Sequence, residues 1–221
     1  MNRTDEPTAA ATLGAGLDEI GLSLRRATVN TLLAYLRLLE LWNRAYNLTA
    51  IRNPVDMVRH HLLDSLVVLP FVRGSRLLDV GTGAGFPGMV IALTSPQLQC
   101  VLLDKNAKKT RFCLQVIAEL GINNVDVVHA RVEDYQPASL FSTVIARAFG
   151  ELCALHALTG HLLQPGGCLI AMKGADPKRE LDALPASCQP PQVISLKVPG
   201  LVTPRHLIIL DAGSVSAADS A

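Results

Sequence analysis

The chain has 221 residues, of which 49% are hydrophobic and only 4% aromatic, and its 20 basic and 19 acidic residues leave a net charge of +1. This length suits one substantial domain with a small extension, and the aromatic-poor, apolar balance favours an α/β fold. Near-neutrality excludes nucleic-acid binding through a global positive field, so any RNA contact has to come from a local patch.

The cysteines and the start of the chain indicate the compartment. The cysteines are odd in number, widely spaced and without a CxxC pair: Cys100, Cys113, Cys153, Cys168 and Cys188. This pattern predicts reduced thiols in a cytosolic protein and neither a disulfide framework nor a zinc site. Residues 1–16 lack the apolar core of a signal peptide, and no run approaches the roughly 20 apolar residues of a membrane span. We expect a soluble, cytoplasmic protein without a bound metal.

Helical periodicity dominates the N-terminal part of the chain. We expect residues 1–15 to be disordered and residues 16–73 to form a helical region. Its first helix is indicated by apolar residues at helical spacing, namely Leu32, Leu33, Tyr35, Leu36, Leu39 and Leu41. A second apolar pattern runs over residues 55–71, after the helix start at Asn53-Pro54.

Strand and helix patterns then alternate through residues 74–212, which we expect to form an α/β domain. Short apolar runs predict strands at residues 76–80, 99–103, 125–129, 143–146 and 168–172, with helices at 107–120 and 152–163. Such alternation predicts a doubly wound, mostly parallel sheet. Residues 192–198 and 206–210 flank Pro199-Gly200 and predict a closing antiparallel hairpin, and residues 213–221 are expected to be a disordered tail.

The first strand leads into the glycine-rich stretch LLDVGTGAGFPG, residues 77–88. Gly81, Gly83 and Gly85 occupy the strand-to-helix turn, where positive φ and close ligand approach both require a missing Cβ. A phosphate-binding P-loop is excluded, because Phe86 and its neighbours stand where Lys and Ser or Thr are needed. A dinucleotide site is weakened by Phe86 but stays open. The spacing from Asp79 to the glycines is typical of class I S-adenosylmethionine-dependent methyltransferases.

Polar residues at the strand ends complete the predicted cofactor site, because ligands of open α/β sheets bind there. Asp79 is expected to pair with the ammonium group of the cofactor, directly or through water. Asp104 is expected to accept both ribose hydroxyls, as an acid at that strand end does in dinucleotide sites. Val132 and Glu133 follow the third strand and suit an adenine, whereas Arg147 ends the fourth strand on the methyl-transfer side or simply pairs with a neighbouring acid.

The sequence resembles the RsmG (GidB) family of bacterial 16S rRNA guanine-N7 methyltransferases from about residue 32 to residue 210. The motifs that carry the resemblance are Trp42-Asn43, Asn47-Leu48-Thr49, His61-Leu62-Leu63-Asp64-Ser65, residues 77–88, Leu103-Asp104, Lys108-Lys109-Thr110-Arg111-Phe112, Arg131-Val132-Glu133 and Ala146-Arg147-Ala148-Phe149. The resemblance implies S-adenosylmethionine as cofactor, with contacts from Gly81, Phe86, Val132, Glu133 and Arg147. It also implies methylation of a guanine N7 in the 530 loop of small-subunit rRNA.

Methylation at guanine N7 does not require a side chain that removes a proton. Guanine N7 carries an exposed lone pair, so no general base is obligatory. Catalysis is expected to depend on alignment, and Arg147 is the candidate positioning residue. The candidate RNA-binding residues are cations that could equally form a solvated face: Lys105, Lys108, Lys109, Arg111, Lys173 and Arg205. The alternatives are a non-catalytic ribosome-binding protein that retains the fold and an NAD-linked oxidoreductase.

Further side chains of the helical region have more than one interpretation. Asp64 lies one helical turn from His60 and His61. A zinc site is disfavoured because no further ligand cluster completes it, so we expect His61 and Asp64 to fasten the helical region to the α/β domain. Trp42, the only tryptophan, is expected in the core, with base stacking as the alternative.

Overall fold

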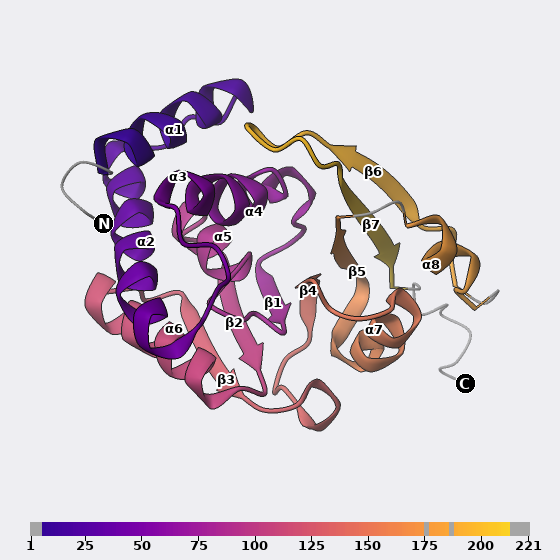
Figure 1. Cartoon of the computed structure of the whole chain (residues 1–221). Helices are drawn as coiled ribbons and strands as arrows, with labels where there is room; N and C mark the ends of the chain where they lie inside the picture. The colour runs from indigo at the N-terminus through magenta and orange to yellow at the C-terminus, as the bar shows by residue number, and fades with distance from the viewer. Residues whose placement is uncertain (1–5, 175–176, 186–187, 213–221) are drawn as a thin grey trace.

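A computed structural model of the chain describes residues 6–174, 177–185 and 188–212. Its centre is a seven-stranded sheet of order β3-β2-β1-β4-β5-β7-β6 (Figure 1). The strands are β1 (Arg76–Val80), β2 (Gln99–Asp104), β3 (Val125–His129), β4 (Phe141–Arg147), β5 (Leu163–Lys173), β6 (Gln192–Leu196) and β7 (Arg205–Asp211). The first five pair in parallel, and β7 is antiparallel to both β5 and β6. The predicted doubly wound sheet and closing hairpin are confirmed.

Helices cover both faces of this sheet (Figure 1). One face packs against α1 (Glu6–Glu19), α2 (Arg26–Tyr46), the helical segment 54–71, α5 (Gly88–Thr94) and α6 (Ala107–Leu120). The other face packs against α7 (Leu152–Thr159) and α8 (Lys178–Asp182). Because side chains alternate along a strand, Leu77 enters the first core and Leu78 the second. The helices before β1 therefore share a core with the sheet.

The expectation of disorder over residues 1–15 is wrong for residues 6–15, which belong to α1. Ala9 and Leu13 are fully buried in the core that α1 shares with the sheet. Small residues gave this segment no clear apolar stripe, and its helix depends on tertiary packing. The expected disorder of residues 1–5 and 213–221 falls outside the described residues. Leu41 also departs from its predicted pattern, since it is 59% exposed on α2.

The helix predicted over residues 55–71 is interrupted. It consists of α3 (Pro54–Met57), a π-helical turn (Val58–Leu63), α4 (Asp64–Leu66) and a 3₁₀ turn (Leu69–Phe71). A π turn carries an extra residue and is frequently found at functional sites. It precedes Asp64 directly, and both His61 and Asp64 are buried. The irregular turn thus brings polar side chains inside the molecule.

The sheet order creates one topological switch point. β1 lies between β2 and β4, so the chain leaves β1 for one side of the sheet and later returns on the other. In open α/β sheets, ligands bind in the crevice at the carboxyl ends of the strands at such a point. Among the described residues, every helix falls short of the length and apolarity that a bilayer crossing demands.

Asn124 secures the connection between α5 and β2, and its removal tests the packing of this half of the sheet. Its side-chain Nδ2 donates to the carbonyls of Ala92 at 3.1 Å and Leu98 at 2.9 Å. Asn124→Ala leaves these acceptors without their donor, so we expect the free energy of unfolding to fall by about 2 kcal/mol in urea titrations. Asn123→Ala, at an exposed neighbour, is the matched control. Equal stability of the two variants would contradict this account.

Candidate functional site

The buried carboxylate of Asp79 holds the glycine-rich loop that follows β1. Asp79 Oδ2 accepts hydrogen bonds from Thr82 Oγ1 at 2.6 Å and from Gly88 N at 2.8 Å. The main chain adds bonds from Gly81 N and Thr82 N to the Leu103 carbonyl. The loop therefore keeps its shape through interactions with its own strand end and with β2.

The predicted positive φ is confirmed at Gly81, Gly83 and Gly85, with values of 68°, 63° and 93°. Their surroundings differ. A Cβ on Gly81 would stand 3.3 Å from the Phe149 ring, whereas one on Gly83 would meet nothing nearer than 3.9 Å. A Cβ on Gly85 would come within 2.5 Å of the Tyr35 hydroxyl. Gly85 thus serves packing against α2, and only Gly81 of the three lines the cavity described next.

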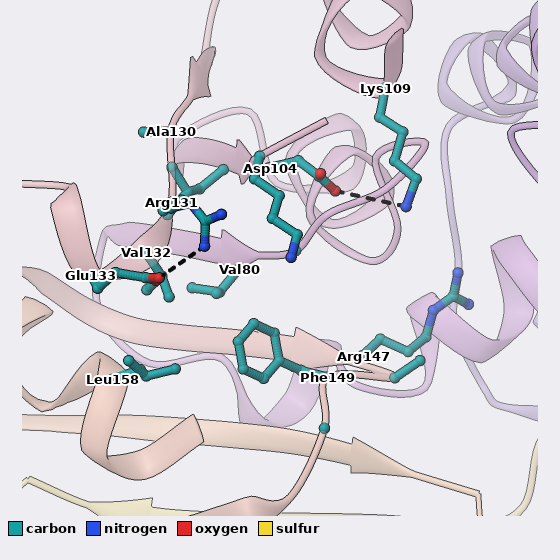
Figure 2. Close-up of a pocket in the computed structure, with 15 residues that line it drawn as sticks. Val80, Asp104, Lys109, Ala130, Arg131, Val132, Glu133, Arg147, Phe149 and Leu158 are labelled. Atoms are coloured by element: carbon teal, nitrogen blue, oxygen red, sulfur yellow. Dashed lines mark hydrogen bonds and ion pairs between the residues drawn. The ribbon is translucent and has the colours of Figure 1, made fainter. Parts of the chain in front are cut away.

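A cavity of about 420 Å³ opens at the switch point, above the carboxyl ends of β1, β2 and β4 (Figure 2). This volume lies within the range of about 300–1,000 Å³ of small-molecule sites. Its lining joins the loop, the ends of three strands and the segment after β4: Val80, Gly81, Asp104, Lys105, Lys109, Val132, Glu133, Arg147, Ala148 and Phe149 are among its residues. Phe149 belongs to a motif that carries the family resemblance but has no place in the predicted site, because a single aromatic residue after a strand carries no specific binding signal.

Asp104 lies in this lining and is only 6% exposed. Its Oδ2 accepts from Gly83 N at 2.9 Å, and its Oδ1 accepts from Asn106 N at 2.8 Å. Lys109 Nζ stands 4.0 Å from Oδ2, as Figure 2 shows. A carboxylate oxygen accepts more than one hydrogen bond, so Asp104 keeps capacity for hydroxyl donors.

The adenine position predicted after β3 also belongs to the cavity. Residues Val132–Asp134 form a short 3₁₀ turn, and Val132 and Glu133 both line the cavity. Hydrogen bonding to its own backbone amide lowers the pKa of Glu133, and Arg131 at 3.4 Å adds to this effect. Glu133 is therefore a carboxylate acceptor at neutral pH.

The structure does not place Asp79 and Phe86 in the cavity wall. Asp79 is fully buried beneath the loop and does not line the cavity, so its expected pairing with the cofactor ammonium, directly or through water, stays a prediction. Burial raises the pKa of Asp79 to about 6, and its Oδ1 has no hydrogen-bond partner among the described residues. The Phe86 ring stacks instead with His61, at a centroid distance of 4.5 Å, and with Tyr35, at 5.0 Å, and so packs against the N-terminal helices.

Arg147 joins the cavity to the helical region. Its Nη1 donates to the His60 carbonyl at 2.8 Å and to Asp64 Oδ2 at 3.1 Å. Arg205 Nε donates to Asp64 Oδ1 at 2.9 Å. The prediction that His61 and Asp64 fasten the helices to the α/β domain is confirmed, because His61 stacks on Phe86 and Asp64 bonds to β4 and β7.

His61 is a neutral side chain within this junction. Burial lowers its pKa to about 3, with further contributions from Arg147 and His60. Its Nε2 lies 3.0 Å from Thr49 Oγ1. Trp42 packs in the predicted manner, with its ring 5.7 Å from that of Phe112 at the edge of the core.

The predicted RNA-binding cations fall into different groups. Lys105, Lys108 and Arg111 are exposed, and Lys109 is half-buried at the cavity. The remaining candidates, Lys173 and Arg205, are committed to internal partners. Lys173 Nζ bonds to Glu180 at 2.6 Å and to the Gly150 carbonyl at 2.7 Å, so it holds the segment after β4. Arg205 bonds to Asp64. These internal partners leave RNA binding by Lys173 and Arg205 a prediction.

Comparison with solved structures agrees with the fold. Solved structures with the same fold include a predicted O-methyltransferase from Agrobacterium tumefaciens, with a TM-score of 0.56 at 22% identity over 70% of this chain and 80% of that one. An S-adenosylmethionine-dependent methyltransferase from Aquifex aeolicus matches with a TM-score of 0.53 at 18% identity, over 70% of this chain and 93% of that one.

Sequence comparison identifies the family. The chain is 52% identical to ribosomal RNA small subunit methyltransferase G of Nitrosococcus oceani, over 90% of this chain and 92% of that protein. It is 47% identical to the protein of the same name from Alkalilimnicola ehrlichii, over 95% of both chains. The family model GidB, described as rRNA small subunit methyltransferase G, matches residues 28–208. The chain therefore belongs to the GidB family of rRNA small subunit methyltransferases.

Proposed function

We propose that this chain transfers a methyl group from S-adenosylmethionine to N7 of a guanine in the 530 loop of 16S rRNA, in the cytoplasm. The observation that carries the proposal is the cavity at the switch point, whose walls bring Gly81, Asp104, Val132, Glu133 and Arg147 together. Membership of the GidB family supports the same conclusion and indicates rRNA of the small subunit as the substrate class.

The residues around the cavity suit this cofactor. Asp104 keeps acceptor capacity for ribose hydroxyls, and Val132 beside Glu133 offers an apolar contact and a carboxylate for an adenine and its amino group. Gly81 leaves free the space that a Cβ would take beside Phe149. The buried charge of Asp79 lies beneath the loop, where it favours a cationic ligand end without touching it. S-adenosylmethionine supplies an electrophilic methyl group bound to a sulfonium sulfur.

The chain's contribution to catalysis is alignment. The N7 lone pair forms the new bond to carbon as the carbon–sulfur bond breaks, its electron pair stays on sulfur and the positive charge moves to the guanine ring. No proton moves, so no general base is needed. Holding both reactants in line is worth roughly 7–11 kcal/mol of barrier. Arg147, anchored by the His60 carbonyl and Asp64, is suited to orient a group at this point.

Cations beside the cavity suit an RNA substrate. Lys105 and Lys109 line the cavity, and Lys108 and Arg111 extend the charge along the first turns of α6. Contacts of this kind to phosphates are sequence-independent, and each adds a log–log salt slope of about 0.7 for single strands. The target strand would therefore approach along α6.

Methyl transfer to ribosomal RNA tests the proposal directly. Labelled S-adenosylmethionine is incubated with this protein and either small ribosomal subunits or deproteinised 16S rRNA from a strain that lacks the gene. Mass spectrometry of nuclease fragments is expected to find one 7-methylguanosine, located in the 530 loop. Incorporation at another nucleotide would refute the assigned target. Cofactor binding without transfer to either substrate would favour a non-catalytic ribosome-binding protein.

A pair of loop variants tests the assignment of the cofactor cavity. Gly81 and Gly83 have nearly the same φ, 68° and 63°, so alanine imposes similar strain of roughly 1–2 kcal/mol at either. Only at Gly81 does the new Cβ enter the cavity wall, 3.3 Å from Phe149. We expect Gly81→Ala to weaken S-adenosylmethionine binding in calorimetry by roughly tenfold more than Gly83→Ala. Equal affinities would remove Gly81 from the binding surface.

Asp79 links stability to pH. Its pKa rises on folding from the ordinary value of 3.8 to about 6 because the carboxyl is buried. The protonated form favours the fold, so this contribution is present at low pH and is lost as the pH rises through 6. Asp79→Asn keeps an acceptor oxygen and carries no charge.

We therefore expect the stability of Asp79→Asn, relative to the unmodified chain, to rise by about 2 kcal/mol between about pH 4 and about pH 8. Urea unfolding at both pH values measures this change. The same substitution should weaken S-adenosylmethionine binding, because the negative charge beneath the loop is gone. A stability difference that does not change with pH would show that burial leaves the Asp79 carboxyl unperturbed.

A further inference from the structure

A second cavity, of about 410 Å³, adjoins the first, and Arg147 and Ala148 line both. We propose that this second cavity receives the target guanine, that Arg147 reads the guanine O6, and that Asp64 is the positioning residue for Arg147. The inference rests on the proposed function and deepens it. The walls of the second cavity come from the helical region, from the end of β5 and from the start of β7, segments that are distant in the sequence and meet only in the folded chain.

The hydrogen-bond capacity of Arg147 is only partly used. Its two acceptors, the His60 carbonyl and Asp64 Oδ2, both bind Nη1. Across the described residues no acceptor is within reach of Nε or Nη2, although the guanidinium carries five N–H donors. The group also lies over the Phe86 ring, with its carbon 5.5 Å from the ring centre. Arg147 is thus anchored through Nη1, and its Nε and Nη2 donors remain for a ligand.

Guanine chemistry matches an arginine at this boundary. O6 and N7 are adjacent acceptors on the same edge of guanine, whereas adenine has an amino donor in place of O6. With N7 directed toward the cofactor cavity, O6 lies beside the group that borders both cavities. Arg147 can then donate to O6 and leave the N7 lone pair free. Adenine would place one donor against another.

The other walls suit a flat ring. Ile51 and the buried Met172 supply apolar surface. Ala148 lines both cavities and has a φ of 54°, a backbone conformation that residues other than glycine rarely adopt. Strained backbone of this kind is concentrated at functional sites, where the surrounding structure holds it in place. This constrained conformation thus occurs at a residue that lines both cavities.

Asp64 makes the cluster of cations possible. Its side chain is 4% exposed and accepts from both Arg147 and Arg205. Without this carboxylate, two guanidiniums would stand beside a sulfonium and, after transfer, beside a cationic base. Asp64 therefore fixes the direction of Arg147 and lowers the repulsion that the reaction has to overcome.

A cavity-filling variant tests where the base binds. Gly174 lines only the second cavity, and a Cβ there would meet nothing nearer than Arg205 Nη1 at 3.5 Å. We expect Gly174→Trp to bind S-adenosylhomocysteine as the unmodified chain does and to lose methyl transfer by roughly a hundredfold, because the base is displaced. Gly160→Trp, at a site with open space outside both cavities, is the control. Full activity of Gly174→Trp would overturn the proposal.

A base analogue tests the roles of Arg147 and Asp64. 2-Aminopurine keeps N7 and lacks O6, so its substitution for the target guanine should slow transfer by roughly tenfold, the worth of one hydrogen bond from a charged donor. Arg147→Gln and Asp64→Asn should both reduce this ratio of rates, which a loss of folded protein alone does not change. Asp56→Asn, a half-exposed neighbour, should keep the ratio. An unchanged ratio in Arg147→Gln would refute the O6 contact.

Failure of this inference is distinct from failure of the proposed function. If the unmodified chain methylates 16S rRNA and Gly174→Trp does so equally well, the function stands and the cavity assignment falls. If the unmodified chain transfers no methyl group, the function falls. Saturation-transfer NMR with guanosine monophosphate, on protein loaded with S-adenosylhomocysteine, then decides the cavity. A transfer signal that disappears in Gly174→Trp supports the assignment, and a signal that persists in this variant refutes it.

Discussion

The buried carboxylate of Asp64 is the interaction on which the rest of the site depends. It joins the irregular helix before the sheet to Arg147 on β4 and to Arg205 on β7. Removing one partner from a buried ion pair costs about 3–5 kcal/mol, because it leaves the other charge without compensation. The helical region is therefore not an appendage to the α/β domain. It supplies the negative charge that allows an arginine to stand beside the proposed cofactor.

In the glycine-rich loop, as around Asp64, some residues only support the structure and others face the cavity. Asp79 holds the loop through Thr82 and Gly88. Gly85 allows α2 to approach, and Gly81 leaves room for a ligand. A motif that suggests one binding surface thus consists mostly of structural support. Its order is set before any ligand arrives, which lowers the entropic cost of binding.

Local signals predicted much of the fold and part of the site. The predicted bounds of β1, β3 and α6 match the structure, because short apolar runs end at clear breaks such as Gly121. That Asp104, Val132 and Glu133 line the cavity was predictable, because they follow strand ends, where open sheets form their crevices. The partners of Asp64 were not, since Arg147 and Arg205 lie 83 and 141 positions away. Helix α1 was missed because burial against later segments stabilises it.

The sequence alone is least informative about which charged side chains form ion pairs, because their partners are brought close only by the tertiary fold. The sequence does not distinguish Lys173 from Lys108 as a candidate for RNA binding. In the structure, Lys173 forms an ion pair with Glu180, whereas Lys108 is exposed. A cation held by internal partners has fewer donors left for a phosphate than an exposed one. Of the predicted RNA-binding cations, Lys105, Lys108 and Arg111 at the start of α6 are exposed, so the proposed RNA contact lies there, next to the cavity. In the proposed complex, a strand bound there would turn one base inward past Arg147, which lines both cavities, and alignment alone would complete the transfer.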